Sequence, residues 1–261
     1  VDIVAKALEV ISGYDKNDTA TWSIPADFDY NFSSATNNAS LEGVRLGLLD
    51  SENTDPQVTK LHERIKKIVN SLGGEVILIN DDRDYPYDAE SYVLLFEFRV
   101  GLEKYLKNSN SSMKTLGDII NFNNANKDVV MPYFGQDIFY ESIESTNYLK
   151  YLWSKYKIIQ SYKSTKNLIE KYNLDAFIGL TRGPAWKINY KGGDYEAINN
   201  SLEFGSGGYA AHNGMPHITV PFFEINNFPV GISIIGDRWN DMSVIRYASA
   251  IEKSRYNLKT Q

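Results

Sequence analysis

The stretch VRLGLLDSENTDPQVTKLHERIKKIVNSLGGEVILIN, residues 44–80, decides the fold class of this sequence. Its two ends, at 44–50 and 75–80, are short apolar runs that predict buried strands. The run 56–72 between them has apolar residues at helical spacing, is opened by Asp55 as a cap and is closed by two glycines. The order strand, helix, strand predicts a βαβ unit with parallel strands. We therefore expect an α/β fold whose sheet is covered by helices on both faces.

The rest of the chain continues the alternation of helix and strand patterns. A helix is expected at 1–11, and the polar stretch 14–41 reads as a long surface loop. Apolar spacing predicts further helices at 87–106, 116–121, 148–172 and 240–254, the last capped by Asn240, and further strands at 175–180, 217–223 and 230–236. No repeat, low-complexity tract or shift of composition marks a linker, so residues 1–261 are expected to form a single α/β domain or a partial domain.

Composition excludes several classes of protein. The 261 residues contain no Cys, which excludes disulfide scaffolds, Cys-ligated metal centres and thiol catalysis. Lys plus Arg number 27 against 33 Asp plus Glu, and no dense basic cluster is present, so nucleic acid is not an expected partner. No run of 18 apolar residues exists, and the first residues lack the basic start and apolar core of a signal peptide. We expect no membrane partner and a cytoplasmic location.

The three histidines are the first candidates for catalysis. His62 is interpreted as a solvated residue on the polar side of the predicted helix 56–72. His212 and His217 follow Ser206 closely, so a Ser/His hydrolase is one hypothesis. A nucleophile elbow, however, needs G-x-S-x-G directly after a strand, and a polar loop precedes Ser206. We interpret Ser206 as a helix-capping residue in a tight loop.

Motifs for metals and nucleotides are absent from the sequence. Two His five residues apart with no carboxylate between them do not form a zinc motif. No Walker loop or G-x-G-x-x-G follows a predicted strand. We therefore expect neither a metal nor a cofactor.

The order of motifs in the C-terminal third resembles the amidase signature family of serine hydrolases. The motifs are LDAFIGLTRGPAW at 174–186, AAHNGMPHITVP at 210–221 and PVGISIIG at 229–236. Upstream, YVLLFEFRVGLEKYLKN, TLGDIINFN and MPYFGQDIF are similar to segments of the peptide-amidase-like branch, so the resemblance covers 1–254 in order. Thr181 and Arg182 depart from the pattern, because many relatives have Pro before the Thr. The resemblance implies the C-terminal part of the amidase signature fold, with a mixed sheet flanked by helices on both faces.

The resemblance also implies which catalytic groups to expect. Family members hydrolyse amide C–N bonds with a serine nucleophile, activated through a second serine and a lysine. All three belong to the half that precedes the point matching Val1, so no catalytic residue is expected in this chain. Neither Ser206 nor Lys127 stands in the family's catalytic context. A catalytic lysine must also be buried to become neutral, and every lysine here occurs in a polar stretch.

The remaining expected contribution is to the wall of a substrate pocket. Loops at the carboxyl ends of sheet strands bind ligands in α/β folds, and the loop after the predicted strand 175–180 is of that kind. Trp186 is expected to pack over a substrate or over the closing helix, and Gln136 to offer its amide to a substrate carbonyl or to cap a turn. The expected substrate-binding residues are Thr181, Gly183, Pro184, Trp186, Phe134 and Gln136.

Three functions are therefore open. The first is the C-terminal portion of an amide hydrolase, supplying scaffold and pocket wall and inactive alone. The second is a non-catalytic small-molecule-binding protein derived from an amidase, and the third is a hydrolase using Ser206 with His212 or His217. The expected partners are a small-molecule amide substrate and either the missing N-terminal half or a second copy joined through an exposed sheet edge.

Overall fold

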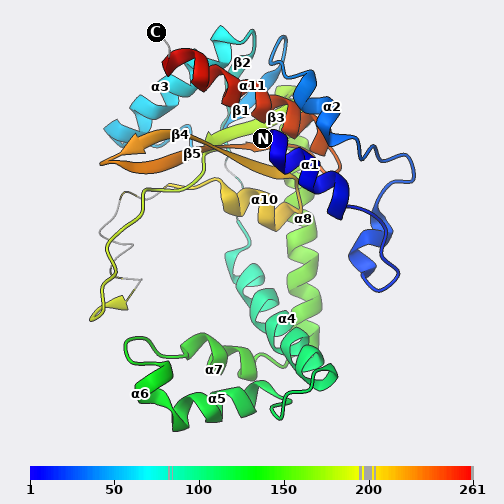
Figure 1. Cartoon of the computed structure of the whole chain (residues 1–261), viewed down its shortest axis with the longest axis vertical. Coiled ribbons are helices and arrows are strands. Elements are labelled where there is room, and N and C mark those ends of the chain that lie inside the picture. Colours follow the sequence, from blue (N-terminus) through cyan, green and yellow to red (C-terminus); the bar gives the residue numbers. More distant parts are fainter. Residues whose placement is uncertain (82, 84, 194–195, 197–201, 203, 260–261) are drawn as a thin grey trace. The chain divides into compact units, whose positions relative to one another are not determined.

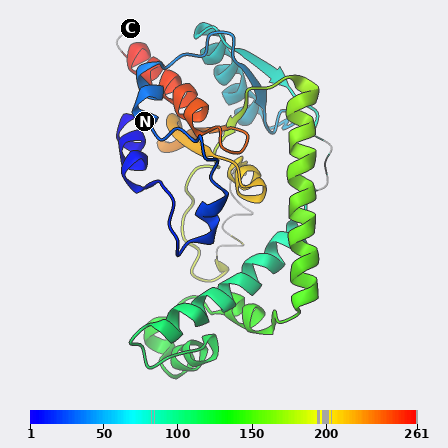
Figure 2. The same cartoon turned by 90° about the vertical axis from the view of Figure 1, so that its right-hand side faces the viewer.

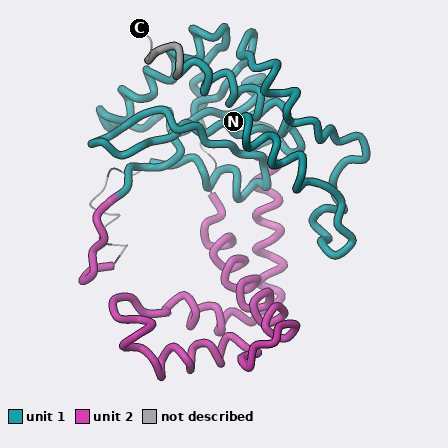
Figure 3. The backbone as a smooth tube through the Cα atoms, in the orientation of Figure 1, with its two compact units in different colours: residues 1–82, 164–185, 201–261 teal, residues 83–163, 186–200 magenta. Residues whose placement is uncertain are grey.

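The computed structural model describes residues 1–81, 83, 85–193, 196, 202 and 204–259, with the backbone alone at 256–259 (Figure 1). Contacts divide the chain into two units (Figure 3). Unit 1 comprises residues 1–82, 164–185 and 201–261, and unit 2 comprises 83–163 and 186–200. The expectation of one domain or a partial domain over 1–261 stays a prediction.

A five-stranded sheet forms the centre of unit 1. Its strands are β1 (Arg45–Leu48), β2 (Glu75–Leu78), β3 (Ala176–Leu180), β4 (His217–Ile225) and β5 (Phe228–Ile235), in the order β2-β1-β3-β5-β4. β1 pairs in parallel with both β2 and β3, whereas β5 pairs antiparallel with β3 and β4. The sheet is therefore mixed, and the predicted βαβ unit is confirmed as β1, α3 (Pro56–Ser71) and β2.

Local chemistry explains why α3 forms where the sequence predicts it. The Asp55 carboxylate accepts hydrogen bonds from the backbone N–H groups of Gln57 and Val58, at 2.7 and 3.3 Å. The interpretation of His62 as solvated is wrong, because its side chain is only 4% exposed. His62 lies four residues after Val58 and three before Ile65, so helical spacing places all three on the face that packs on the sheet.

The β4–β5 hairpin owes its register to its turn. Asn226 and Asn227 both have positive φ, at 52° and 66°, which is the backbone that a two-residue type I′ turn requires and that Asn tolerates. Ile225 consequently pairs with Phe228, and Thr219 with Ser233 further along the ladder.

Helices cover both faces of the sheet, as expected (Figures 1 and 2). On one face, α3 and α11 (Asp241–Lys259) enclose the largest buried apolar cluster, which includes Leu48, Ile178 and Ile234. On the other face, the Phe177 ring meets Tyr209 of α10 (Gly207–Asn213), with ring centroids 5.0 Å apart. The alternation of side chains along each strand separates these two layers.

The N-terminal part of unit 1 holds more helix than expected. α1 (Asp2–Ile11) agrees with the prediction, but the predicted loop 14–41 contains η1 (Thr19–Ser23) and α2 (Phe32–Asn37). The prediction of an uninterrupted loop is therefore wrong. Phe32 of α2 is buried in a small cluster with Ala5 and Ile245, so distant partners stabilise this helix rather than its own polar sequence.

The described part of unit 2 is helical. It contains α4 (Tyr87–Asn108), α5 (Leu116–Ala125), α6 (Lys127–Val130), α7 (Asp137–Glu144) and the first part of α8 (Tyr148–Tyr172). Figure 2 shows α8 as one unbroken helix. α5 begins with a capping box between Thr115 and Asp118. Within the described ranges, none of the helices combines the length and apolar character needed to cross a membrane.

Candidate functional site

The loop that follows β3 is fixed by backbone hydrogen bonds on two sides. The Thr181 N–H donates to the Gly231 carbonyl of β5 at 2.9 Å, and the Gly183 N–H donates to the Phe204 carbonyl at 3.0 Å. Pro184 is buried, while Thr181 and Gly183 are half-buried. Backbone hydrogen bonds therefore place Thr181 and Gly183 at the carboxyl end of β3, inside unit 1, with the buried Pro184 next to them.

A cluster of polar side chains surrounds Thr181 on one face of the sheet. We call Thr181, His217, Thr219 and Ser233 the hydroxyl–imidazole cluster. Ser233 Oγ donates to Thr181 Oγ1 at 2.9 Å, and His217 Nε2 lies 2.7 Å from Ser233 Oγ. Thr219 Oγ1 completes the group at 3.4 Å from both Thr181 Oγ1 and His217 Nε2. The Thr219–Ser233 register and the period of two along each strand bring these groups to one face.

The burial of its serine limits what this cluster can do. The bond between Ser233 and His217 runs in either direction, because the imidazole donates from Nε2–H in one tautomer and accepts the serine proton in the other. Partial burial of the ring lowers the pKa of His217, although much of the residue remains exposed, and the lower pKa favours the neutral ring. The cluster therefore holds a serine hydroxyl beside a neutral imidazole, but Ser233 is fully buried, so its hydroxyl is not presented to solvent.

Sequence reasoning missed Thr219 and Ser233. The signal for them was the polar side chains at alternate positions of two apolar strands, His217 and Thr219 in one and Ser233 in the other. These side chains become neighbours of Thr181 only through the hairpin register, which pairs Thr219 with Ser233. That register could not be read from the sequence.

Ser206 does not pair with either of its neighbouring histidines. Its buried hydroxyl donates to the Leu180 carbonyl at 2.8 Å, whereas His217 bonds Ser233 and His212 Nδ1 lies 2.6 Å from the Gly208 carbonyl. Ser206 does occupy the N-cap position of α10, as expected. Its side chain makes no capping hydrogen bond, so the capping role itself is wrong.

The other predicted pocket residues lie in unit 2. The Gln136 amide is buried: its Nε2 donates to Asn124 Oδ1 and its Oε1 accepts from Asn123, both at 2.9 Å. Gln136 is the N-cap residue of α7, but its side chain makes no capping hydrogen bond, so the expected capping of a turn is wrong. The Phe134 ring stacks with Tyr190 at 6.4 Å between centroids. Tyr190 and Trp186 line an open cavity of 560 Å³.

The structure thus places the predicted pocket residues in two groups. Thr181, Gly183 and Pro184 belong to unit 1, whereas Phe134, Gln136 and Trp186 belong to unit 2. Their substrate-binding roles stay predictions. Among the residues that the structure describes, no group of three or more His, Cys, Asp or Glu side chains could hold a metal ion.

Comparisons by family model, by sequence and by structure all match this chain to amidases. A family model described as Amidase matches residues 1–245. The structure of native peptide amidase from Stenotrophomonas maltophilia is similar over 97% of this chain, with a TM-score of 0.84 and 26% identity. A Schizosaccharomyces pombe protein provisionally named an amidase is 28% identical over 92% of this chain. A segment of 45 residues, 17% of this chain, is 56% identical to 10% of a glutamyl-tRNA(Gln) amidotransferase polypeptide from Thermotoga maritima.

The matches also show how much of each relative is represented. The chain covers 52% of the Stenotrophomonas maltophilia structure and 45% of the Schizosaccharomyces pombe protein, so it spans about half their length. The likeness nevertheless extends over nearly all of this chain, and the family model covers far more than half of it. The chain therefore belongs to the amidase signature family.

Proposed function

We propose that this chain is the C-terminal portion of an amide C–N hydrolase, in which it supplies scaffold and one wall of the substrate pocket. In this proposal the chain is inactive alone, because the nucleophilic serine and the catalytic lysine lie in a part of the enzyme that it does not contain. The observation that carries the proposal is the match of nearly the whole chain to 52% of a peptide amidase.

The geometry of the described residues supports a chain that contributes to the pocket wall but supplies no catalytic group. The Ser206 hydroxyl donates to the Leu180 carbonyl, and Ser233, the serine that bonds His217, is fully buried and out of reach of a substrate. No lysine is among the buried side chains of the described residues, and a lysine that acts as a base needs burial to lower its pKa. The half-buried Thr181 and Gly183 offer polar groups at the carboxyl end of β3, where α/β folds bind ligands.

The first experiment measures the chain alone. We expect no ammonia release from peptide amides above the buffer rate, and we expect Ser206→Ala and His217→Ala to leave that rate unchanged. Turnover by the wild-type chain that either substitution abolishes would overturn the proposal in favour of a Ser/His hydrolase.

The second experiment restores the missing portion. The N-terminal part of the Stenotrophomonas maltophilia peptide amidase that this chain does not match is joined to the present chain, and hydrolysis of peptide amides is measured. We expect activity, with Thr181→Val raising KM about tenfold because a positioned hydroxyl is lost. An inactive chimera, together with binding of peptide amides to the chain alone in calorimetry, would favour the non-catalytic binding protein.

A further inference from the structure

The first part of α8 exposes an uninterrupted apolar stripe. Leu149, Leu152, Tyr156 and Ile159 follow one another at spacings of three, four and three residues, and Trp153 adjoins Leu152, which places all five on one side of the helix. We call these residues the α8 seam: Leu149, Leu152, Trp153, Tyr156 and Ile159, with exposures of 77, 45, 58, 49 and 49%. Folded monomers rarely leave so many adjacent large apolar side chains in water. The spacing is that of a helix that packs along another helix.

The opposite side of α8 is already occupied. The Tyr151 ring stacks on Phe96 of α4 at 4.4 Å between centroids, and Ser154 is buried. Lys155, on one flank of the seam, is neutralised by Glu97 at 3.2 Å. The seam therefore remains uncovered while its neighbouring faces are used within unit 2.

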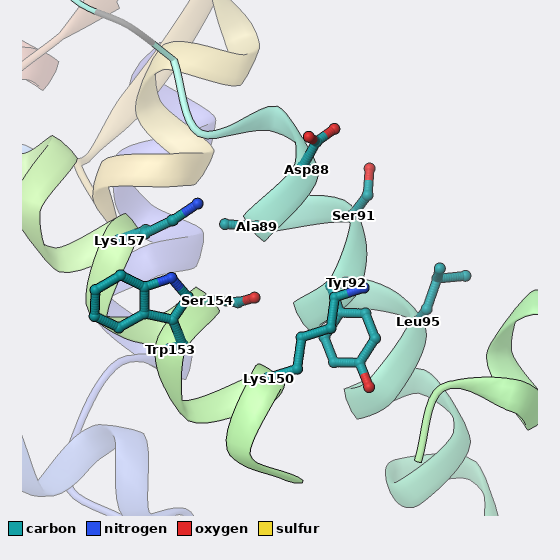
Figure 4. A pocket seen from close by; sticks show the side chains of 9 residues that line it. All are labelled: Asp88, Ala89, Ser91, Tyr92, Leu95, Lys150, Trp153, Ser154 and Lys157. Atoms are coloured by element: carbon teal, nitrogen blue, oxygen red, sulfur yellow. The ribbon is translucent and has the colours of Figure 1, made fainter. Parts of the chain in front are cut away.

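A cavity borders the seam on its other flank. It has a volume of 440 Å³ and lies between α4 and α8 (Figure 4). Its walls are Asp88, Ala89, Ser91, Tyr92, Leu95, Lys150, Trp153, Ser154 and Lys157. Trp153 belongs to both the seam and the cavity, so a helix lying on the seam would pass over the cavity mouth.

The cavity lining has a net positive charge, because it contains the ammonium groups of Lys150 and Lys157 and a single carboxylate, that of Asp88. Lys150 Nζ lies 4.1 Å from the centre of the Tyr92 ring, and neither Lys150 nor Lys157 pairs with a carboxylate among the described residues. The Ser154 hydroxyl also lines this cavity and points toward α4 in Figure 4. A carboxylate entering the cavity would find an ammonium group to pair with in its wall.

We propose that the α8 seam and this cavity form a docking surface for an amphipathic helix with an acidic flank, contributed by the polypeptide portion that completes the enzyme. The inference rests on the proposed function, which requires such a portion. The length of the relatives supports this occupant, because the chain represents 52% of the peptide amidase structure and the rest has no counterpart here. The apolar stripe of the incoming helix covers the seam, and one of its Asp or Glu side chains enters the cavity.

Charge argues against a second copy of this chain as the occupant. In a symmetric pair, α8 would face the same surface of its partner. Lys150, Lys157 and Lys163 would then meet the same lysines, with no carboxylate on the seam to compensate. A partner helix with acidic residues along its flank would instead attract these lysines.

Binding of designed helical peptides to the full chain tests the surface. The probe is a fluorescein-labelled helix of about three heptads, with leucine at the a and d positions of each heptad and glutamate at the e and g positions. Its matched control carries lysine at e and g. We expect saturable binding of the acidic peptide in fluorescence anisotropy, and about tenfold weaker binding of the basic peptide because of like-charge repulsion.

Variants of the chain assign the binding to the seam and the cavity. Leu152→Lys should abolish binding of the acidic peptide, and the pair Lys150→Gln with Lys157→Gln should abolish the preference for the acidic peptide. Matched controls outside the surface are Val129→Lys, at a residue 81% exposed, and Lys104→Gln with Lys107→Gln, which line a separate cavity of α4. Circular dichroism establishes that each variant keeps its helical content.

Three results would overturn the inference. The first is no binding of the acidic peptide, and the second is equal binding of both peptides, which would reveal only non-specific apolar contact. The third is a dimer in sedimentation that Leu152→Lys dissociates, which would make a second copy the occupant. In the chimera, failure of the docking surface leaves activity insensitive to Leu152→Lys, whereas failure of the proposed function leaves the chimera inactive with or without that substitution.

Discussion

His62 is a titratable group that folding has placed among apolar side chains. It lies on the core face of α3, and its Nε2 has no hydrogen-bond partner in the part of the chain that the structure describes. Burial lowers its pKa from the ordinary value of 6.5, and this effect outweighs the nearby Asp50 carboxylate, which acts in the opposite direction. The folded protein therefore holds His62 neutral at pH values where an unfolded chain already binds a proton.

This difference predicts how stability depends on pH. Between pH 6.5 and the lowered pKa of His62, the unfolded state binds more protons, so the free energy of unfolding falls as the pH drops through that window. The contribution of His62 to that fall is about 1.4 kcal/mol for each unit by which its pKa is lowered. His62→Leu, which keeps the apolar packing, should therefore lose less stability than wild type between about pH 7.5 and 5.5 in urea unfolding. Equal losses would contradict the assignment.

The Ser206 side chain leaves no space for a side chain at position 179 of β3, which is a glycine. A Cβ at this position would overlap the Ser206 hydroxyl and lie 3.2 Å from Leu49 Cβ. Gly179→Ala should lower the free energy of unfolding by about 1–3 kcal/mol, because the packed layer must shift. Gly101→Ala in α4 is the matched control: nothing lies within 4 Å of its Cβ, so it should raise stability by up to about 1 kcal/mol through helix propensity. Denaturant unfolding compares the two variants.

At the scale of elements, the stability of the first turn of α3 should depend on the carboxylate of Asp55. Asp55 satisfies the N–H groups of Gln57 and Val58, which have no other acceptor within the first turn. Asp55→Ala should cost about 1 kcal/mol of unfolding free energy, measured in urea. Asp55→Asn keeps an acceptor oxygen and should retain most of that stability. Equal destabilisation by both substitutions would show that the acceptor is not the stabilising feature.

The elements that the sequence predicted are those whose signals are local. α3 has an apolar period within its own residues and a cap and a glycine pair directly beside them, and β1 and β2 are short apolar runs. α2 and α7 were missed because their formation depends on distant contacts: Phe32 of α2 meets Ala5 and Ile245, and Phe139 of α7 stacks with Phe98. Periodicity within a window of sequence contains no information on such partners.

The candidate site was predictable only in part for the same reason. Thr181, Gly183 and Pro184 follow a predicted strand, so their place at its carboxyl end could be inferred. Thr219 and Ser233 could not, because their approach to Thr181 depends on antiparallel register across two strands. The role of Gln136 was ambiguous in sequence because its amide bonds Asn123 and Asn124, which lie 13 and 12 residues upstream.

At the scale of the whole molecule, buried apolar surface is divided unequally between the two units. Among the residues that the structure describes, the main buried apolar cluster lies entirely within unit 1. In unit 2, most large apolar side chains that the structure describes are exposed, including Leu94, Tyr105, Ile138 and the α8 seam. Because apolar burial is the main favourable term in folding, unit 2 should be the less stable unit.

Hydrogen exchange followed by mass spectrometry tests this difference directly. We expect backbone amides of α4, α5 and α7 to exchange about tenfold faster or more than those of β1 and β3, because the opening free energy of unit 2 is lower. Addition of the acidic helical peptide should slow exchange in α4 and α8 and leave β1 and β3 unchanged, since binding stabilises the unit that holds the docking surface. Leu152→Lys should remove that protection, and Val129→Lys should preserve it. Uniform protection of both units in the free chain would mean that the few buried residues of unit 2, such as Tyr92 and Leu116, suffice to stabilise it.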